Sequence, residues 1–313
     1  MCQEIQVMKK DLLSKVKPWV LPIAMVSGVV FHNDIGKIAF LSPYLIFIML
    51  LITYCKVSLK DFKVTRIIWV MLAIQILGAI AVYLVLRPAN PDIAQGAFIC
   101  VFCPTATAAP VVTGMLGGSV TLVATYSILS NAAVAILAPI LFSLIGVHPD
   151  ISFVDSILTI STKVFPLIMA PLALALLLQA FIPRAHRIIS SHQSMSFYVW
   201  AIALFIVVGN AVSFIMHQPL SRIPIMLMIA FASLITCCGQ FYIGRKIGKR
   251  YGDKVSGAQG LGQKNTVLAI WMALTYLDPV ASVGPAAYVA WQNTINSLQL
   301  FHKAKQTAQT AKS

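Results

Sequence analysis

The residue with the clearest chemical potential in this sequence is a lysine inside an apolar segment. Lys264 lies in the polar run 263–266, near the middle of the apolar segment 255–277. An ionisable side chain near the centre of a membrane segment is a functional candidate by default. A lysine close to a segment end, such as Lys163, can extend its ammonium to the interface, but Lys264 lies too deep for this. We therefore expect its ammonium to attract an anion or to take the place of a coupling cation.

Two apolar segments contain residues that interrupt a helix, at corresponding places in the two halves of the chain. Pro104 and Pro110 flank two threonines in one segment, and each proline removes a backbone donor. Gly260 and Gly262 precede Lys264 in the other. A simple proline kink is the alternative at either site alone. Non-helical backbone at membrane depth survives only facing protein or water, so we expect helix breaks at these four residues, with free helix ends that bind a ligand.

The candidate binding residues are polar or helix-breaking residues in and around these two breaks. Those expected to hydrogen-bond near the Lys264 ammonium are Gln263, Asn265, Thr107 and Asn293. The full set of predicted substrate- or ion-binding residues is Gln75, Thr105, Thr107, Pro110, Asn131, Gln263, Lys264, Asn265, Thr266 and Asn293.

Motifs of the common enzyme classes are absent from the sequence. There is no HExxH, no GxSxG, no paired intramembrane carboxylates and no phosphate-binding loop. Cys100 and Cys103 have a CxxC spacing, but no second pair or histidine cluster accompanies them, so helix packing explains them better. We expect no enzyme activity, no metal site and no cofactor, apart from one sodium ion or proton as a coupling ion.

The composition indicates a membrane protein. Of the 313 residues, 59% are hydrophobic and 10% charged, whereas soluble domains carry about 25% charged residues. The net charge of +14 would suggest nucleic acid binding in a soluble protein, but here the basic residues lie between the apolar segments. The polar start, 2–17, predicts no cleavable signal peptide. We expect an all-α polytopic membrane protein whose partners are the lipid bilayer and a small organic anion, with no nucleic acid and no obligate protein partner.

Ten apolar segments are predicted, and the basic residues support this count. The segments are 18–34, 38–55, 67–86, 92–115, 119–146, 157–181, 197–216, 223–244, 255–277 and 279–301. With ten crossings, one face receives 18 of the 23 basic residues, and the other receives only Lys37, Arg87 and Arg222. Because basic loops stay in the cytoplasm, we expect a multi-pass protein of the cell inner membrane with both termini cytoplasmic.

The two halves of the chain resemble each other. A shift of 161 residues places 38–55 on 199–216, 67–86 on 228–247 and 119–146 on 280–307. Each half holds five segments, an odd number, so the second half enters the membrane in the opposite orientation. Inverted repeats of this kind are typical of secondary transporters, whose substrate binds between the halves near the midplane.

The sequence around both breaks resembles the bile acid:sodium symporters and their bacterial relatives, from about Trp19 to Phe301. The resemblance is carried by Cys103, Pro104 and Thr107 in the fourth segment, Gly262 and Asn265 in the ninth, Ala138-Pro139 in the fifth, Gln75 in the third and the polar run 291–297 in the tenth. It implies a panel domain of helices 1, 2, 6 and 7 and a core domain of helices 3, 4, 5, 8, 9 and 10. Broken helices 4 and 9 would cross in the core, beside two sodium sites and a cavity for amphipathic organic anions.

The residues that would bind sodium differ from the family pattern. Where the family has Ser-Asn after the fourth-helix break, this chain has Ala109-Pro110, without side-chain oxygens. Where the family's ninth-helix break has a bridging glutamate and then a glutamine, this chain has Gly260 and Lys264. A hard cation such as sodium needs several oxygen ligands, so two-sodium coupling is not expected.

The domain boundaries follow from the repeats. They are a cytoplasmic segment 1–17, a first five-helix repeat 18–146, an extracytoplasmic connection 147–156, a second repeat 157–302 and a cytoplasmic tail 303–313. We expect a secondary transporter of a small organic anion that works by alternating access. A transporter-like membrane sensor or binding protein without transport is the alternative, and a channel is a further class that the matched breaks disfavour.

Overall fold

The computed structural model describes residues 23–55, 62–146, 152–191 and 193–310, and every regular element within them is a helix. The predicted segment 1–17 and most of the connection 147–156 lie outside the described residues. After a first helix, 23–30, the elements in chain order are α2 (His32–Ile35), η1 (Gly36–Leu41), α3 (Ser42–Tyr54), α4 (Arg66–Leu86), α5 (Pro91–Phe102), α6 (Ala109–Leu116), α7 (Val120–Ile145), α8 (Phe153–Phe181), α9 (Pro183–Ser191), α10 (Gln193–Met216), η3 (Leu220–Arg222), α11 (Ile223–Arg250), α12 (Lys254–Gly262), α13 (Thr266–Tyr276), η4 (Pro279–Ser282) and α14 (Val283–Thr310).

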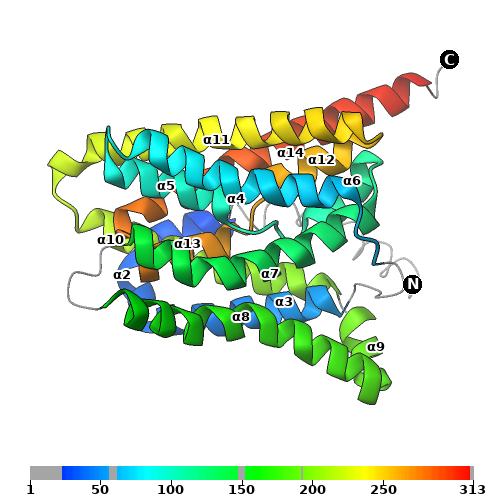
Figure 1. Cartoon of the computed structure of the whole chain (residues 1–313), viewed down its shortest axis with the longest axis horizontal. Coiled ribbons are helices and arrows are strands. Elements are labelled where there is room, and N and C mark those ends of the chain that lie inside the picture. Colours follow the sequence, from blue (N-terminus) through cyan, green and yellow to red (C-terminus); the bar gives the residue numbers. More distant parts are fainter. Residues whose placement is uncertain (1–22, 56–61, 147–151, 192, 311–313) are drawn as a thin grey trace, which may run out of the picture.

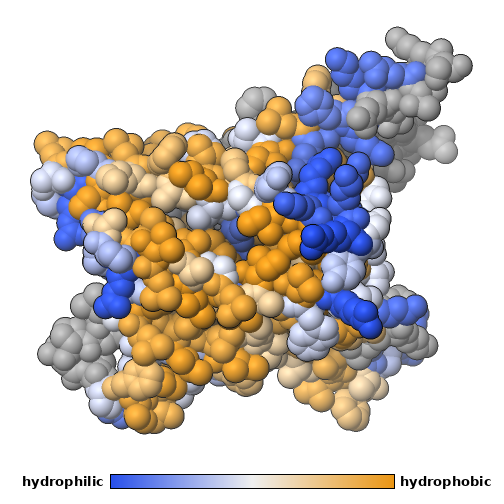
Figure 2. Space-filling model, turned by 45° about the horizontal axis from the view of Figure 1, so that its top comes forward, coloured by the Kyte–Doolittle hydropathy of each residue, from blue (hydrophilic) through white to orange (hydrophobic). Residues whose placement is uncertain are grey.

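The helices have the length and composition of membrane spans. Six stretches of the described chain are long and apolar enough to cross a bilayer, namely His32–Tyr54, Arg66–Leu86, Val120–Ile145, Phe153–Phe181, Tyr198–Met216 and Leu220–Arg250. Large apolar side chains also cover much of the outer surface (Figure 2). A soluble protein would bury such residues, whereas lipid solvates them. The chain is therefore an all-α membrane protein.

Several helices begin and end close to the predicted boundaries, and two run further. α4 and α7 differ from the predicted segments 67–86 and 119–146 by one residue at most at each end. α11 continues to Arg250, beyond the predicted end at residue 244, and α14 continues to Thr310 through part of the predicted tail. Apolarity marks only the lipid-embedded part of a helix, and lysine, arginine and glutamine are good helix formers outside it.

Side chains at the helix starts explain where the short helices begin. The Asn90 side chain accepts hydrogen bonds from the Asp92 and Ile93 N–H groups, and Pro91 occupies the first turn of α5, where no donor is needed. The Asp253 carboxylate accepts from the Ser256 N–H at the start of α12. These caps fix the entry of both short helices into the fold.

The long helices lie side by side around one large apolar core. Figure 1 shows α11 along one edge of the molecule and α8 along the opposite edge, with α4, α5, α7 and α13 between them. Aromatic rings of the core pack in contact: Phe98 stacks on Phe102, and Phe142 stacks on Tyr276. This packing holds α5 and α13, two helices that each end or begin at an interruption, against α7.

Candidate functional site

The two interrupted segments meet each other at the centre of the molecule. Helix stops after Phe102 and resumes at Ala109 in the first half, and it stops after Gly262 and resumes at Thr266 in the second. Thr105 and Lys264 form an isolated antiparallel bridge between the two breaks. The Asn265 N–H donates to the Pro104 carbonyl at 2.8 Å. Each break therefore supplies partners for backbone groups of the other, which removes the large cost of leaving them unpaired in lipid.

The prolines and glycines of the breaks have different roles. Pro104 lies within the first interruption, whereas Pro110 lies in the first turn of α6, where its missing N–H is harmless. Gly260 and Gly262, expected to break the helix, instead lie in the last turn of α12. A Cβ on Gly260 would lie 2.3 Å from the Met71 Cε, and one on Gly262 would overlap the Phe241 ring. These glycines allow close packing, and the interruption itself covers residues 263–265.

Lys264 is fully buried at the crossing, with 1% of its surface exposed. Its ammonium donates to the carbonyl oxygens of Val101 at 2.8 Å and Cys103 at 3.0 Å. These carbonyls belong to the C-terminal end of α5, where the helix dipole places partial negative charge. Among the described salt bridges none involves Lys264, so backbone oxygens rather than a carboxylate hold this positive charge in the interior.

A side chain from α14 holds the backbone of Lys264. The Lys264 N–H donates to the Gln292 Oε1 at 2.9 Å, and the Gln292 Nε2 donates back to the Lys264 carbonyl at 3.4 Å. The sequence analysis singled out the neighbouring Asn293 for this region, which lies partly buried beside Gln292. A glutamine in a polar helix gives no signal in the sequence that would separate it from the residue next to it.

Gln75 joins α4 to the first break. Its Nε2 donates to the carbonyl oxygens of Phe102 at 2.8 Å and Cys103 at 3.2 Å. Its Oε1 accepts from the Tyr126 hydroxyl at 2.7 Å and the Ser130 hydroxyl at 2.8 Å, both from α7. The side chain uses both its donor and its acceptor within the protein, so it fixes the end of α5 rather than waiting for a ligand.

Neutral hydroxyls bind the carbonyl groups at the end of α12. Thr105 Oγ1 donates to the Gly260 carbonyl at 2.8 Å, and the Tyr288 hydroxyl donates to the Gly262 carbonyl at 2.8 Å. The two half-helices thus end differently, because the carbonyl groups of α5 face an ammonium and those of α12 face hydroxyl groups. The crossing carries one fixed positive charge on the side of α5.

Three predicted residues hold a buried polar atom without a partner among the described contacts. They are the Asn131 Oδ1, the Asn265 Nδ2 and the Thr266 Oγ1, and all three residues are at most 4% exposed. An unpaired polar group in a protein interior costs about 1–3 kcal/mol. A bound ion, substrate or water would relieve this cost, so these atoms are the ones at the crossing most able to accept a ligand.

The remaining predicted residues are placed as follows. The Gln263 carbonyl accepts from the Ala106 N–H at 3.0 Å, and the Gln263 Nε2 donates to the Gln259 Oε1. Thr107 lies in the first break and is partly exposed. Tyr126 and Tyr288 were not singled out from the sequence, although both lie at matched places in the two halves and each bonds to one break.

Comparison with known proteins does not identify the chain. No family model matches it, and no curated protein matches it significantly. Its function must therefore be inferred from the sequence and from the geometry of the crossing.

Proposed function

We propose that the chain is a secondary transporter of the bile acid:sodium symporter type, which moves a small organic anion across the inner membrane by alternating access. The observation that carries this proposal is the meeting of two interrupted helices around the buried ammonium of Lys264. Unwound backbone at membrane depth is expensive, and transporters use it to bind ligands between two halves of the fold. A structural membrane protein would have no need of it.

A ten-helix inverted repeat is supported by the order of the elements. We assign the first repeat to the helix that ends at Ile35, α3, α4, the α5–α6 pair and α7. The second consists of α8, α10, α11, the α12–α13 pair and α14. In each half the fourth member is the interrupted one and the fifth is a long helix. The termini are then both cytoplasmic, as the basic residues favour.

Reciprocal contacts between the halves support the same repeat. The Asp278 N–H, before η4, donates to the Gln95 Oε1 of α5 at 2.7 Å. The Ser119 N–H, before α7, donates to the Ser256 Oγ of α12 at 2.7 Å. Gln95 and Ser256 are separated by the repeat distance of 161 residues. Each interrupted helix therefore holds, near its first turn, the segment before the last helix of the other half.

The contacts beside the crossing are repeated as well. In the first half, the Tyr126 hydroxyl of α7 donates to Gln75 of α4. In the second, Gln240 of α11 donates to the Tyr288 hydroxyl of α14 at 3.0 Å. A glutamine of the third helix and a tyrosine of the fifth thus pair in both halves and contact the breaks, which is the arrangement expected from a duplicated five-helix unit.

The fixed ammonium supports an anionic substrate and argues against two-sodium coupling. Lys264 already occupies the Val101 and Cys103 carbonyl oxygens, which could otherwise coordinate a cation. A second cation beside it would be repelled, whereas an anion would be attracted. We propose that Lys264 replaces one coupling ion permanently, and that at most one sodium ion or proton accompanies the substrate.

The alternative is a transporter-like sensor that binds an anion without moving it. The observation in its favour is the same pair of Lys264 contacts, because a crossing held closed by its own ammonium could be rigid. Transport requires the crossing to move relative to the panel helices, whereas sensing requires only binding.

Uptake into proteoliposomes tests the proposal. Vesicles containing the purified protein would be offered radiolabelled taurocholate, pantothenate or pyruvate, with sodium or choline as the outside cation. We expect at least one anion to accumulate in the lumen and to exchange with unlabelled anion loaded inside, unlike in protein-free vesicles. Saturable binding with no label trapped inside the lumen would identify a sensor instead.

A further inference from the structure

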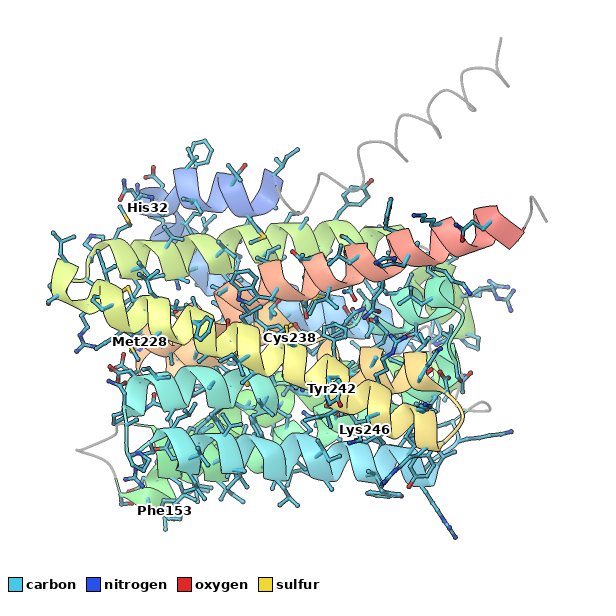
Figure 3. The ribbon with its side chains drawn as sticks, turned by 90° about the horizontal axis from the view of Figure 1, so that it is seen from above. His32, Phe153, Met228, Cys238, Tyr242 and Lys246 are labelled. Atoms are coloured by element: carbon cyan, nitrogen blue, oxygen red, sulfur yellow. The ribbon has the colours of Figure 1, made fainter. Side chains whose placement is uncertain are left out.

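One face of α11 changes from apolar to basic along its length. Leu227, Phe231 and Ile235 are each more than half exposed, and the exposed Tyr242 follows them. Figure 3 shows Met228, Cys238, Tyr242 and Lys246 in order along this helix. At about 1.5 Å per residue, the stretch from Ile223 to Tyr242 spans roughly 28 Å, close to the thickness of the hydrocarbon core. Tyrosine prefers the membrane interface, so the last turns of α11 lie at the level of the lipid head groups.

Those last turns carry a concentrated positive charge. Arg245, Lys246, Lys249 and Arg250 are all exposed, whereas Ile247 packs inward against the cluster at the start of α4. This contact brings the exposed residues Lys63 and Arg66 beside the end of α11. We call these residues, Lys63, Arg66, Arg245, Lys246, Lys249 and Arg250, the basic surface. Figure 2 shows hydrophilic residues gathered at one end of the molecule beside its apolar surface.

The basic surface is not neutralised within the described chain. Neither of the salt bridges described involves any of its residues. The carboxylate that follows α11, Asp253, already accepts hydrogen bonds from the Ser256 side chain and from the Ser119 N–H. Uncompensated charge at the head-group level attracts anionic lipid, by about fivefold in affinity for each basic residue near the surface.

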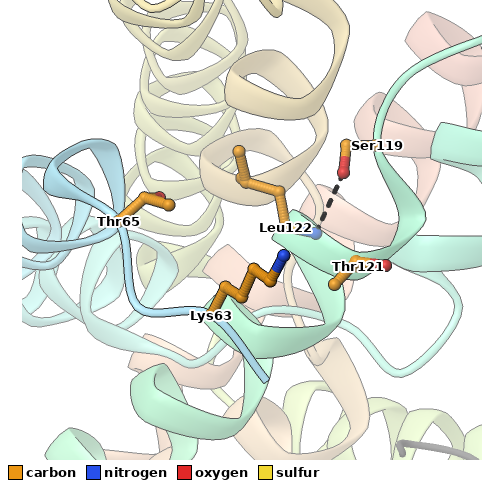
Figure 4. A pocket seen from close by; sticks show the side chains of 5 residues that line it. All are labelled: Lys63, Thr65, Ser119, Thr121 and Leu122. Atoms are coloured by element: carbon orange, nitrogen blue, oxygen red, sulfur yellow. Dashed lines mark hydrogen bonds between the residues drawn. The ribbon is translucent and has the colours of Figure 1, made fainter. Parts of the chain in front are cut away.

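A pocket of about 340 Å³ opens next to the start of α4. Lys63, Thr65, Ser119, Thr121 and Leu122 line it. Figure 4 shows the Lys63 ammonium pointing toward the start of α7. One ammonium and three hydroxyl groups are suitable donors for a phosphate oxygen.

We propose that the basic surface binds an anionic phospholipid, with the phosphate of its head group in this pocket and its acyl chains along the apolar face of α11. The continuity of apolar residues, interfacial tyrosine and basic residues on one helix fits a lipid, which has the same sequence of chemical layers. A soluble anion would have no use for the apolar face.

Thermal unfolding in detergent tests this proposal, with added phosphatidylglycerol compared with phosphatidylcholine. We expect phosphatidylglycerol to raise the midpoint and phosphatidylcholine to have a smaller effect. The triple variant Arg245→Gln, Lys246→Gln, Lys249→Gln should lower the apparent affinity for phosphatidylglycerol by roughly a hundredfold at low salt. The matched control Lys163→Gln, Arg184→Gln, Arg187→Gln removes the same charge from exposed positions elsewhere and should leave the affinity within about twofold.

Two further measurements separate the lipid from other anions and test the pocket. Inorganic phosphate at the same concentration should not reproduce the rise, and Thr65→Val with Thr121→Val should weaken phosphatidylglycerol alone. The proposal is overturned if phosphatidylcholine stabilises equally, if phosphate substitutes for the lipid, or if the two triple variants lose the same affinity. An unchanged affinity in the threonine variant would place the head group outside the pocket and overturn that part of the proposal.

Discussion

Replacing Lys264 by glutamine tests the central element of the proposed mechanism. Lys264 is fully buried, and its ammonium lies 2.8 Å from the Val101 carbonyl oxygen and 3.0 Å from that of Cys103. Glutamine keeps a hydrogen-bond donor at this place but removes the charge. Because no carboxylate would be left unpaired, we expect the variant to fold, with a change in stability of only about 1–3 kcal/mol.

The effect on ligands is expected to be much larger than the effect on folding. At an effective dielectric constant near 20, two unit charges about 4 Å apart interact with about 4 kcal/mol. That corresponds to roughly a thousandfold in affinity at about 1.4 kcal/mol per decade. The unmodified protein should therefore repel sodium at the crossing and attract an anion, and Lys264→Gln should reverse both preferences.

Uptake of radiolabelled anion into proteoliposomes, measured against sodium concentration, checks this prediction. We expect a sodium Hill coefficient of at most one in the unmodified protein, and lost or reshaped uptake in Lys264→Gln. Lys163→Gln, which changes an exposed lysine, is the matched control and should behave like the unmodified protein. A Hill coefficient near two together with a fully active Lys264→Gln variant would refute the reasoning.

Three other predictions concern packing, acid stability and orientation. A Cβ on Gly244 would lie 2.2 Å from the Gly257 carbonyl oxygen, so Gly244→Ala should destabilise by at least about 2 kcal/mol, whereas Gly239→Ala on the same helix meets nothing within 4 Å and should be neutral in thermal unfolding. Burial raises the pKa of the Asp253 carboxyl, but hydrogen bonds from Ser256, Ser119 and Val255 outweigh it and hold the pKa below its usual range. The carboxylate therefore stabilises the fold above the ordinary carboxyl pKa and loses this effect as the pH falls through the lowered value, so Asp253→Asn should unfold at a lower temperature at pH 7 and at the same temperature as the unmodified protein at strongly acidic pH. Reporter fusions at Ser313 and in the loop 147–155 should give opposite signals, and matching signals would contradict the ten-helix count.

The sequence predicts the positions of the interruptions better than their causes. The prolines place the first break correctly between residues 102 and 109, because a missing donor has a local effect that does not depend on the rest of the fold. Gly260 and Gly262 are different. Their role depends on Met71 and Phe241, which belong to other helices, so a local reading takes a packing contact for a break.

The same distinction applies to Lys264. Its depth in an apolar segment is visible in the sequence, and the structure buries it completely. Its partners are backbone carbonyl groups of α5 and the side chain of Gln292, and backbone carbonyls carry no residue-specific signal at all. Short-range propensity therefore predicts which residues are unusual, whereas the contacts that explain them depend on how helices distant in the sequence approach one another.

A positive charge that is covalently attached to the carrier has a consequence for the electrical behaviour of transport. A sodium ion can dissociate after delivery, but the Lys264 ammonium must return with the protein. If the crossing moves through the membrane field, the loaded step carries the ammonium and a monovalent anion together and is electroneutral. The empty return carries one net positive charge, and each 100 mV across the full field contributes about 2.3 kcal/mol to it. We therefore expect the membrane voltage to act on the unloaded carrier, so that an interior-negative potential favours the cytoplasmic-facing state between cycles.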